Sequence, residues 1–240
     1  MNMYKRFFKR LIDIVLSFLG IVILALPMLI IAIAVKCDSK GPALFKQKKI
    51  GKNKKHFTML KFRSMRTETP PNAPTHELND PTKWITKVGS FLRKTSLDEL
   101  PQIFNIFVGQ MSIIGPRPAI WNQYDLIEER EKYGANAVRP GLTGLAQING
   151  RDVLAQDTQR KAWYDGEYVK KITFWGDLKI FFKTIGKVLK RADIVEGDTV
   201  SELKKENTDN TVVEEVAAAE LKESKVLEYE TQTEPQEKAQ

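Results

Sequence analysis

A run of 22 residues without a charged side chain, at positions 14–35, constrains this chain more than any other feature. As a helix it would extend roughly 33 Å, about the thickness of the hydrocarbon core of a bilayer. A cleaved signal peptide is the weaker interpretation, because the run is long for the hydrophobic region of such a segment. The segment is therefore predicted to lie in a membrane.

Hydropathy alone favours a single span, but two features favour a segment that enters one leaflet and returns. Basic residues flank both ends: Lys5, Arg6, Lys9 and Arg10 before it, and Lys36, Lys40, Lys46, Lys48 and Lys49 after it. The positive-inside rule then places both ends in the cytoplasm. Pro27, near the middle, removes a backbone hydrogen bond and kinks or breaks a helix. We expect residues 1–36 to form a re-entrant helix-break-helix.

Charge is distributed unevenly along the rest of the chain. Residues 196–240 carry 13 acidic against 5 basic side chains, a net charge of −8. Because the whole chain has a net charge of +8, residues 1–195 have a net charge of +16. Such a basic body requires a polyanionic partner. The tail, 196–240, is polar with few aromatic residues and is predicted to be disordered or loosely helical. Residues 37–195 are expected to form the cytosolic domain.

A basic amphipathic helix is predicted at residues 177–191. Its apolar positions recur at helical spacing: Leu178, Phe181, Phe182, Ile185, Val188 and Leu189. Its lysines occupy the other side: Lys179, Lys183, Lys187 and Lys190. An ordinary surface helix would show the same pattern, but the hydrophobic segment upstream favours docking at a membrane interface.

The soluble part is predicted to be α+β, mainly helical with a small β-hairpin. Residues 43–47 and 57–62 flank a turn-like cationic sequence at 51–55, as in a hairpin. Four prolines between positions 67 and 81 predict a loop. Helical spacing then resumes at 97–107, 121–133 and 158–169. Turns are expected at 139–144 and 148–151.

An adjacent carboxylate pair, Asp98 and Glu99, is the strongest chemical signal. One cysteine, Cys37, and two histidines exclude a zinc constellation and a Cys/His or Ser/His/Asp relay. An aspartate can attack phosphorus to form an acyl phosphate if cations neutralise the phosphoryl oxygens. Helix capping is the plainer interpretation: Ser96 and Glu99 have capping-box spacing, and Asp98 could cap a helix with Pro101 in its first turn. A helix N-terminus also binds phosphate, so both interpretations are compatible.

Several ordered motifs together resemble the monotopic phosphoglycosyl transferases, bacterial sugar transferases that start glycan assembly on a polyprenyl phosphate. The resemblance covers residues 5–193. The motifs are 41–47 (GPALFKQ), 50–52 (IGK), 61–65 (KFRSM), 92–102 (LRKTSLDELPQ), 111–118 (MSIIGPRP), 139–144 (RPGLTG) and 149–151 (NGR). In this family a Ser-Pro pair often breaks the re-entrant helix, whereas Leu26 precedes Pro27 here.

The resemblance implies a reaction. Asp98 would attack the β-phosphate of a UDP-sugar, release UMP and hold the sugar phosphate until undecaprenyl phosphate takes it. This is the initiating step of a bacterial surface glycan, such as an exopolysaccharide or capsule, at the cytoplasmic face of the inner or plasma membrane. Other glycan-assembly enzymes or a second copy of the chain are possible partners, and nucleic acid is not expected.

The resemblance also implies residue roles. Asp98 would ligate Mg²⁺, and Glu99 would support the site. Phosphate and substrate binding would involve Lys61, Arg63, Arg93, Arg117, Arg139, Arg151 and Asp165. For Asp165, a carboxylate on a helix surface is an equally good interpretation.

Two other functions are compatible with the sequence. A membrane-tethered glycosyltransferase would release UDP, and its usual Asp-x-Asp motif has only Asp165-Gly166-Glu167 as a counterpart. A non-enzymatic basic scaffold would bind anionic lipid or nucleic acid through phosphate contacts alone. The residues do not indicate which sugar is transferred.

Overall fold

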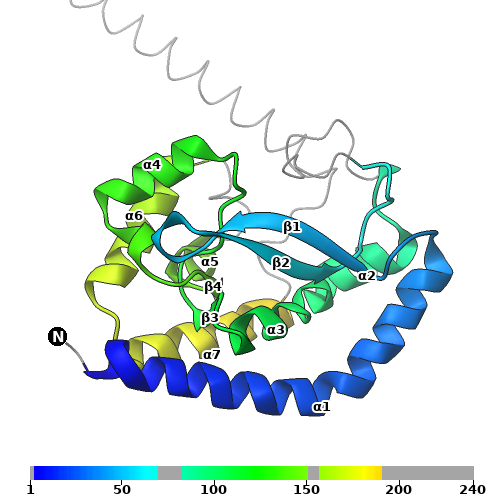
Figure 1. The fold of residues 1–240 in the computed structure, drawn as a ribbon, viewed down its shortest axis with the longest axis horizontal. Coiled ribbons are helices and arrows are strands. Elements are labelled where there is room, and N and C mark those ends of the chain that lie inside the picture. Colours follow the sequence, from blue (N-terminus) through cyan, green and yellow to red (C-terminus); the bar gives the residue numbers. More distant parts are fainter. Residues whose placement is uncertain (1–2, 70–82, 151–156, 191–240) are drawn as a thin grey trace, which may run out of the picture. The chain divides into compact units, whose positions relative to one another are not determined.

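The computed structural model describes residues 3–69, 83–150 and 157–190 (Figure 1). The mainly helical α+β class is confirmed. A π-helical turn, Tyr4–Phe8, continues into α1, Lys9–Asp38. The other helices are α2 (Lys87–Thr95), α3 (Gln102–Phe107), α4 (Tyr124–Lys132), α5 (Leu145–Gly150), α6 (Thr158–Lys170) and α7 (Phe174–Lys190). Short 3₁₀ turns occupy Lys52–Lys54, Leu97–Glu99 and Ala135–Ala137. Arg151, the acidic tail and most of the expected proline-rich loop lie outside the described residues.

The predicted hairpin is confirmed. Strands β1 (Leu44–Ile50) and β2 (His56–Phe62) pair antiparallel, with Phe45 opposite Lys61. The turn between them is closed by Gly51, whose N–H donates to the Lys55 carbonyl at 2.7 Å. The hairpin therefore holds Lys61 in a fixed register.

A second, parallel strand pair was not expected from the sequence. Strands β3 (Ser112–Ile114) and β4 (Gly141–Thr143) pair with Ser112 opposite Gly141. A Cβ on Gly144 would lie only 2.1 Å from the Gly115 carbonyl oxygen, so only glycine permits this close approach. Residues 145–150 then form α5, and the turn expected at 148–151 is corrected to helix over its described part.

Helix α1 does not break at Pro27. Helical structure runs without interruption from Lys9 to Asp38, which corrects the expected helix-break-helix. Instead, the helix bends part-way along its length, so that its two arms lie along different sides of the body (Figure 1). A proline inside a helix is the usual cause of such a bend, because it removes a hydrogen bond and crowds the preceding turn.

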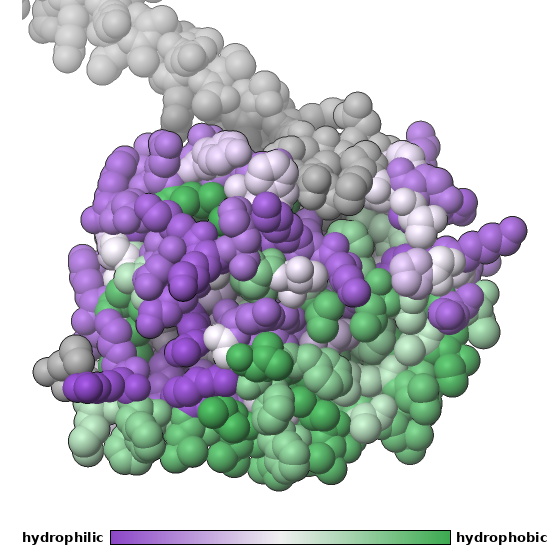
Figure 2. Space-filling model, viewed as in Figure 1, coloured by the Kyte–Doolittle hydropathy of each residue, from purple (hydrophilic) through white to green (hydrophobic). Residues whose placement is uncertain are grey.

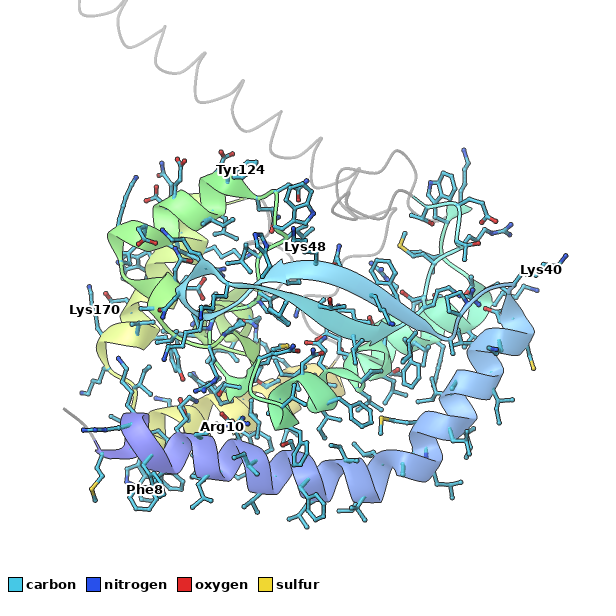
Figure 3. The ribbon with its side chains drawn as sticks, viewed as in Figure 1. Phe8, Arg10, Lys40, Lys48, Tyr124 and Lys170 are labelled. Carbon is cyan, nitrogen blue, oxygen red and sulfur yellow. The ribbon has the colours of Figure 1, made fainter. Side chains whose placement is uncertain are left out.

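Polar contacts hold the N-terminal arm of α1 against the body. Lys9 Nζ lies 2.6 Å from an Asp177 carboxylate oxygen on α7, and the Asp13 carboxylate accepts a 3.0 Å hydrogen bond from the Ile113 N–H. Arg10 donates to the last carbonyls of α3, those of Ile106 and Phe107. Figure 3 shows Arg10 directed toward the body and Phe8 away from it.

The C-terminal arm of α1 is fastened to the same body. Met28 and Val35 pack with Phe62 of β2 and Leu92 of α2 in one hydrophobic cluster. Arg63 donates to the carbonyls of Val35, Ser39 and Lys40 at the end of α1, at 3.2, 2.7 and 2.5 Å. Both arms of the hydrophobic helix therefore contact one folded unit.

The outward side of α1 is apolar. By length and composition, the helical stretch Tyr4–Asp38 could cross a membrane. Ile23 is 70% exposed and Leu26 66% exposed, although both are hydrophobic. The amphipathic helix is confirmed as α7, which also exposes Trp175 and Phe182. Figure 2 shows the hydrophobic surface gathered on the side where α1 lies, opposite a hydrophilic side.

Candidate active site

A strained turn places the two carboxylates. Ser96 ends α2 in the left-handed conformation, with φ 58°, and its N–H donates to the Arg93 carbonyl at 3.1 Å. The chain then turns into Leu97–Glu99, where Asp98 and Glu99 are both buried. A left-handed residue other than glycine carries an energetic cost, which is often found at functional sites.

Helix capping does not explain this pair. Ser96 makes no side-chain capping hydrogen bond to the turn that follows it, so the capping box is absent. The residue that precedes α3 is Pro101, which corrects the interpretation of Asp98 as its N-cap.

Glu99 is held by two cations from different parts of the chain. Lys61 Nζ, on β2, donates to Glu99 Oε1 at 2.9 Å. Arg117, after β3, donates to the same oxygen at 2.7 Å and to Oε2 at 3.4 Å. Charge-assisted bonds of this kind fix both the carboxylate and its partners.

Asp98 is less fully neutralised than its neighbour. Its Oδ2 lies 3.9 Å from Lys61 Nζ, beyond hydrogen-bonding distance. Burial raises the pKa of the Asp98 carboxyl, and the charges of Lys61, Arg93 and Arg117 oppose this rise while Glu99 adds to it. The structure thus brings together five of the predicted residues: Asp98, Glu99, Lys61, Arg93 and Arg117.

The backbone around Arg117 is fixed by distant residues. The Pro116 carbonyl accepts a 2.8 Å hydrogen bond from the Gly141 N–H at the start of β4. The Arg117 carbonyl accepts one at 2.9 Å from Arg130 on α4. The sequence does not predict Arg130 as a site residue, because it lies in a charged helix and the spacing of its residues does not reveal which face is buried.

Asp165 belongs to this support rather than to the carboxylate pair. Both Arg130 Nε and Nη2 donate to Asp165 Oδ2, at 2.9 and 2.6 Å, and both residues are buried. The ion pair therefore links α6 to the Arg117 backbone, and Asp165 is not the helix-surface carboxylate considered above. A Cβ on Gly166 would meet Tyr133 at 2.5 Å, so the Asp165-Gly166-Glu167 segment is packed against the body.

Two other predicted phosphate ligands are occupied elsewhere. Arg63 is buried and bonded to the three carbonyls at the end of α1. Arg139 donates from Nε to the Gly109 carbonyl at 2.9 Å. Among the described residues, no contact links Arg63 or Arg139 to Asp98. Arg151 lies outside the described residues.

A largely apolar cavity of about 610 Å³ adjoins Glu99, the neighbour of Asp98 in the carboxylate pair. Its hydrophobic wall comes from α1, α3 and α7 and includes Leu16, Gly20, Ile23, Ile103, Phe181 and Ile185. Ser96, Glu99 and Arg117 also line it. One cavity therefore joins the charged site to the helices that carry the exposed hydrophobic surface.

Within the part of the chain that the structure describes, no group of three or more His, Cys, Asp or Glu side chains could hold a metal ion. Magnesium, however, is commonly bound through one or two carboxylates together with substrate phosphates. Asp98 fits that mode, because both oxygens of Glu99 already accept hydrogen bonds while Asp98 lies outside the hydrogen-bonding distance of Lys61.

The family model of the bacterial sugar transferases matches residues 4–191. The chain belongs to the bacterial sugar transferase family. The resemblance seen in the sequence motifs is therefore confirmed over nearly all of the chain that precedes the acidic tail.

Three relatives illustrate the similarity within the bacterial sugar transferases. An uncharacterized sugar transferase of Haemophilus influenzae is 41% identical over 203 residues, which cover 78% of this chain and 42% of the relative. The UDP-glucose:undecaprenyl-phosphate glucose-1-phosphate transferase of Klebsiella pneumoniae is 40% identical over 199 residues, covering 78% and 41%. The undecaprenyl-phosphate galactose phosphotransferase of Salmonella typhimurium is 39% identical over 201 residues, also covering 78% and 41%. The chain spans less than half the length of the curated relatives it matches.

Proposed function

We propose that this chain transfers a sugar 1-phosphate from a UDP-sugar to undecaprenyl phosphate, giving undecaprenyl-diphosphate-sugar and UMP. One observation carries the proposal: in a buried carboxylate pair, Glu99 is held by Lys61 and Arg117 and lines an apolar cavity that reaches α1 and α7, while Asp98 lies next to it. Such a site suits one substrate with phosphates and another with a hydrocarbon chain. Two of the relatives, those from Klebsiella pneumoniae and Salmonella typhimurium, are named for the same type of reaction.

The reaction would proceed in two displacements at one phosphorus atom. An Asp98 oxygen attacks the β-phosphorus of the UDP-sugar, the bond from that phosphorus to the bridging oxygen breaks, and UMP leaves with the electron pair. A phosphate oxygen of undecaprenyl phosphate then attacks the same phosphorus, and the bond to Asp98 breaks. The carboxylate is regenerated, so no other nucleophile is required.

Cations of the site would stabilise the charge on the phosphoryl oxygens. Lys61 and Arg117 are held by Glu99 before substrate arrives, and preorganised charges of this kind lower the barrier more than mobile ones. Mg²⁺, held by Asp98 and the diphosphate, would supply further neutralisation of the phosphoryl oxygens.

The hydrophobic helix would enter one leaflet and return to the cytoplasmic side. A helix that crosses the bilayer has its ends in different aqueous compartments, whereas Lys9 and Asp38 both contact the same folded body: Lys9 bonds Asp177, and Asp38 accepts from the Val88 N–H at 3.0 Å. The exposed apolar side of α1 and the aromatic residues of α7 would then lie in the interface. Undecaprenyl phosphate would reach the carboxylates through the adjoining cavity.

The released nucleotide tests the proposal. The full chain in nanodiscs, given Mg²⁺ and undecaprenyl phosphate, is screened against UDP-glucose, UDP-galactose and UDP-N-acetylhexosamines. We expect release of UMP with at least one donor. Release of UDP would instead indicate transfer of a bare sugar, and no nucleotide release with any donor would favour a non-enzymatic scaffold. The undecaprenyl-diphosphate-sugar formed together with UMP would begin a bacterial surface glycan.

A further inference from the structure

Lys49 shares the site-facing side of the hairpin with Lys61. Phe45 pairs with Lys61 and Lys49 pairs with Phe57, and cross-strand partners project from the same face. Because side chains alternate along a strand, residues 45 and 49 project to that face and Lys48 to the other. Figure 3 shows Lys48 at the outer side of β1, and its ammonium group lies 5.2 Å from the centre of the Trp121 ring.

Contacts at the end of β1 bring Lys49 close to the Arg117 segment. Lys49 forms an antiparallel bridge with Ile120, and the Ile50 N–H donates to the Ala119 carbonyl at 3.0 Å. Ala119 and Ile120 follow Arg117 by only two and three residues. The backbone of Lys49 therefore lies beside the segment that follows Arg117.

The surroundings of Lys49 do not balance its charge. The residue is 8% exposed, and across the described ranges no hydrogen bond or salt bridge reaches its ammonium group. Burial lowers the pKa of Lys49 well below its usual value, and Lys61, Arg117 and Lys161 lower it further, while Glu99 opposes them. A buried cation next to three other cations is costly unless an anion binds there.

We propose that Lys49 binds the α-phosphate of the UDP-sugar, which becomes the phosphate of the departing UMP. This inference rests on the proposed function. Lys61, whose ammonium group lies 3.9 Å from Asp98, is paired with Phe45, which is four residues from Lys49 along β1, or roughly 13 Å of strand. Lys49 therefore extends toward the site from the end of β1 that is bridged to Ile120, farther along the hairpin from the nucleophile than Lys61, and we place the phosphate that is not attacked at this end.

The role follows from the electron balance of the first displacement. When the bond between the β-phosphorus and the bridging oxygen breaks, its electron pair stays on that oxygen, and the α-phosphate gains negative charge. An ammonium at the α-phosphate stabilises this charge as it develops. Lys61 and Arg117 can meanwhile neutralise the phosphoryl group that remains on Asp98.

The test is the affinity of the full chain in nanodiscs for UMP and for uridine, measured by isothermal titration calorimetry. Lys49→Met should weaken UMP binding at least about tenfold and leave uridine binding unchanged, as expected for loss of a charge-assisted hydrogen bond. Lys49→Arg should recover part of the affinity. Lys48→Met removes an exposed lysine that lies 5.2 Å above the Trp121 ring and should bind UMP like the wild type.

The outcomes separate this inference from the proposed function. Equal UMP affinity of the wild type and Lys49→Met would overturn the role of Lys49 while leaving the transferase reaction intact. Failure of the wild type itself to bind UMP would count against the transferase reaction and the inference together. If Lys49→Met did not fold, Lys49→Arg decides: a folded Lys49→Arg protein that has lost UMP binding as fully as expected for a neutral side chain, with uridine binding retained, would contradict a role in phosphate binding.

Discussion

Asp98 and Glu99 are consecutive in the chain, yet Lys61 Nζ lies 2.9 Å from the Glu99 carboxylate and 3.9 Å from that of Asp98. The bidentate contact from Arg117 also goes to Glu99. Glu99 is therefore the carboxylate that organises the cations, and Asp98 is the one whose charge is less fully neutralised. This asymmetry supports different roles for the two residues.

Replacing Glu99 by glutamine should slow the reaction without abolishing it. The neutral amide would hold Lys61 and Arg117 less firmly, so we expect UMP release to fall about 10- to 100-fold, as is typical for groups that orient a reactive site. Asp98→Asn should release no UMP above background. Equal losses in the two variants, measured under the same conditions, would contradict the division of roles.

The buried pair of Arg130 and Asp165 should govern stability. Asp165→Asn leaves the Arg130 charge buried and poorly paired, which costs about 3–5 kcal/mol and lowers the Tm by at least about 6 °C. Glu167→Gln, which removes an exposed partner of Lys170, is the matched control and should leave the Tm nearly unchanged. An Asp165→Asn protein with wild-type Tm and no activity would instead indicate a direct catalytic role.

Cysteine labelling tests the topology of α1. In a Cys37→Ser background, single cysteines at Met3 and Lys40 should both react with a membrane-impermeant maleimide only from the cytoplasmic side. A cysteine at Leu26, whose side chain is 66% exposed on the apolar side of α1, should be protected from both sides and serves as the control. Labelling of the Met3 position from outside the cell would indicate a true span.

Lys49 should make stability depend on pH. Its pKa is lowered in the folded state, so above that pKa the unfolded chain binds more protons and the free energy of unfolding rises with pH. Lys49→Met removes the burial cost of the charge. The variant should therefore have the higher Tm near neutral pH, by about 3 °C for each kcal/mol. The difference should shrink as the pH approaches about 10.4, the ordinary pKa of lysine. A difference that stays constant with pH would contradict this account.

The sequence indicates those parts of the fold that depend on local patterns. Turn residues between two β-prone runs predict the hairpin, and helical spacing predicts α7. The strands β3 and β4 are only three residues long and lie far apart in the chain, so no periodicity reveals their pairing. The path of α1 through Pro27 depends on packing against Phe62 and Leu92, which a local pattern does not show.

The sequence motifs predict which residues form the site, but they do not predict every contact that these residues make. Arg63 follows Lys61 by two residues and would share its face in a continuing strand, but β2 ends at Phe62, and Arg63 bonds the end of α1. The roles of Arg130 and Lys49 depend on burial within charged segments. Composition alone does not distinguish such residues from exposed neighbours such as Lys48.

The covalent step on Asp98 is the central claim, and intact-mass spectrometry tests it most directly. The full chain is incubated with Mg²⁺ and a UDP-sugar that supports UMP release, without undecaprenyl phosphate. We predict a gain of one sugar-phosphate mass in the wild type, none in Asp98→Asn, and loss of the added mass when undecaprenyl phosphate is supplied. An unmodified wild-type mass under conditions of active turnover, or the same adduct on Asp98→Asn, would contradict the account.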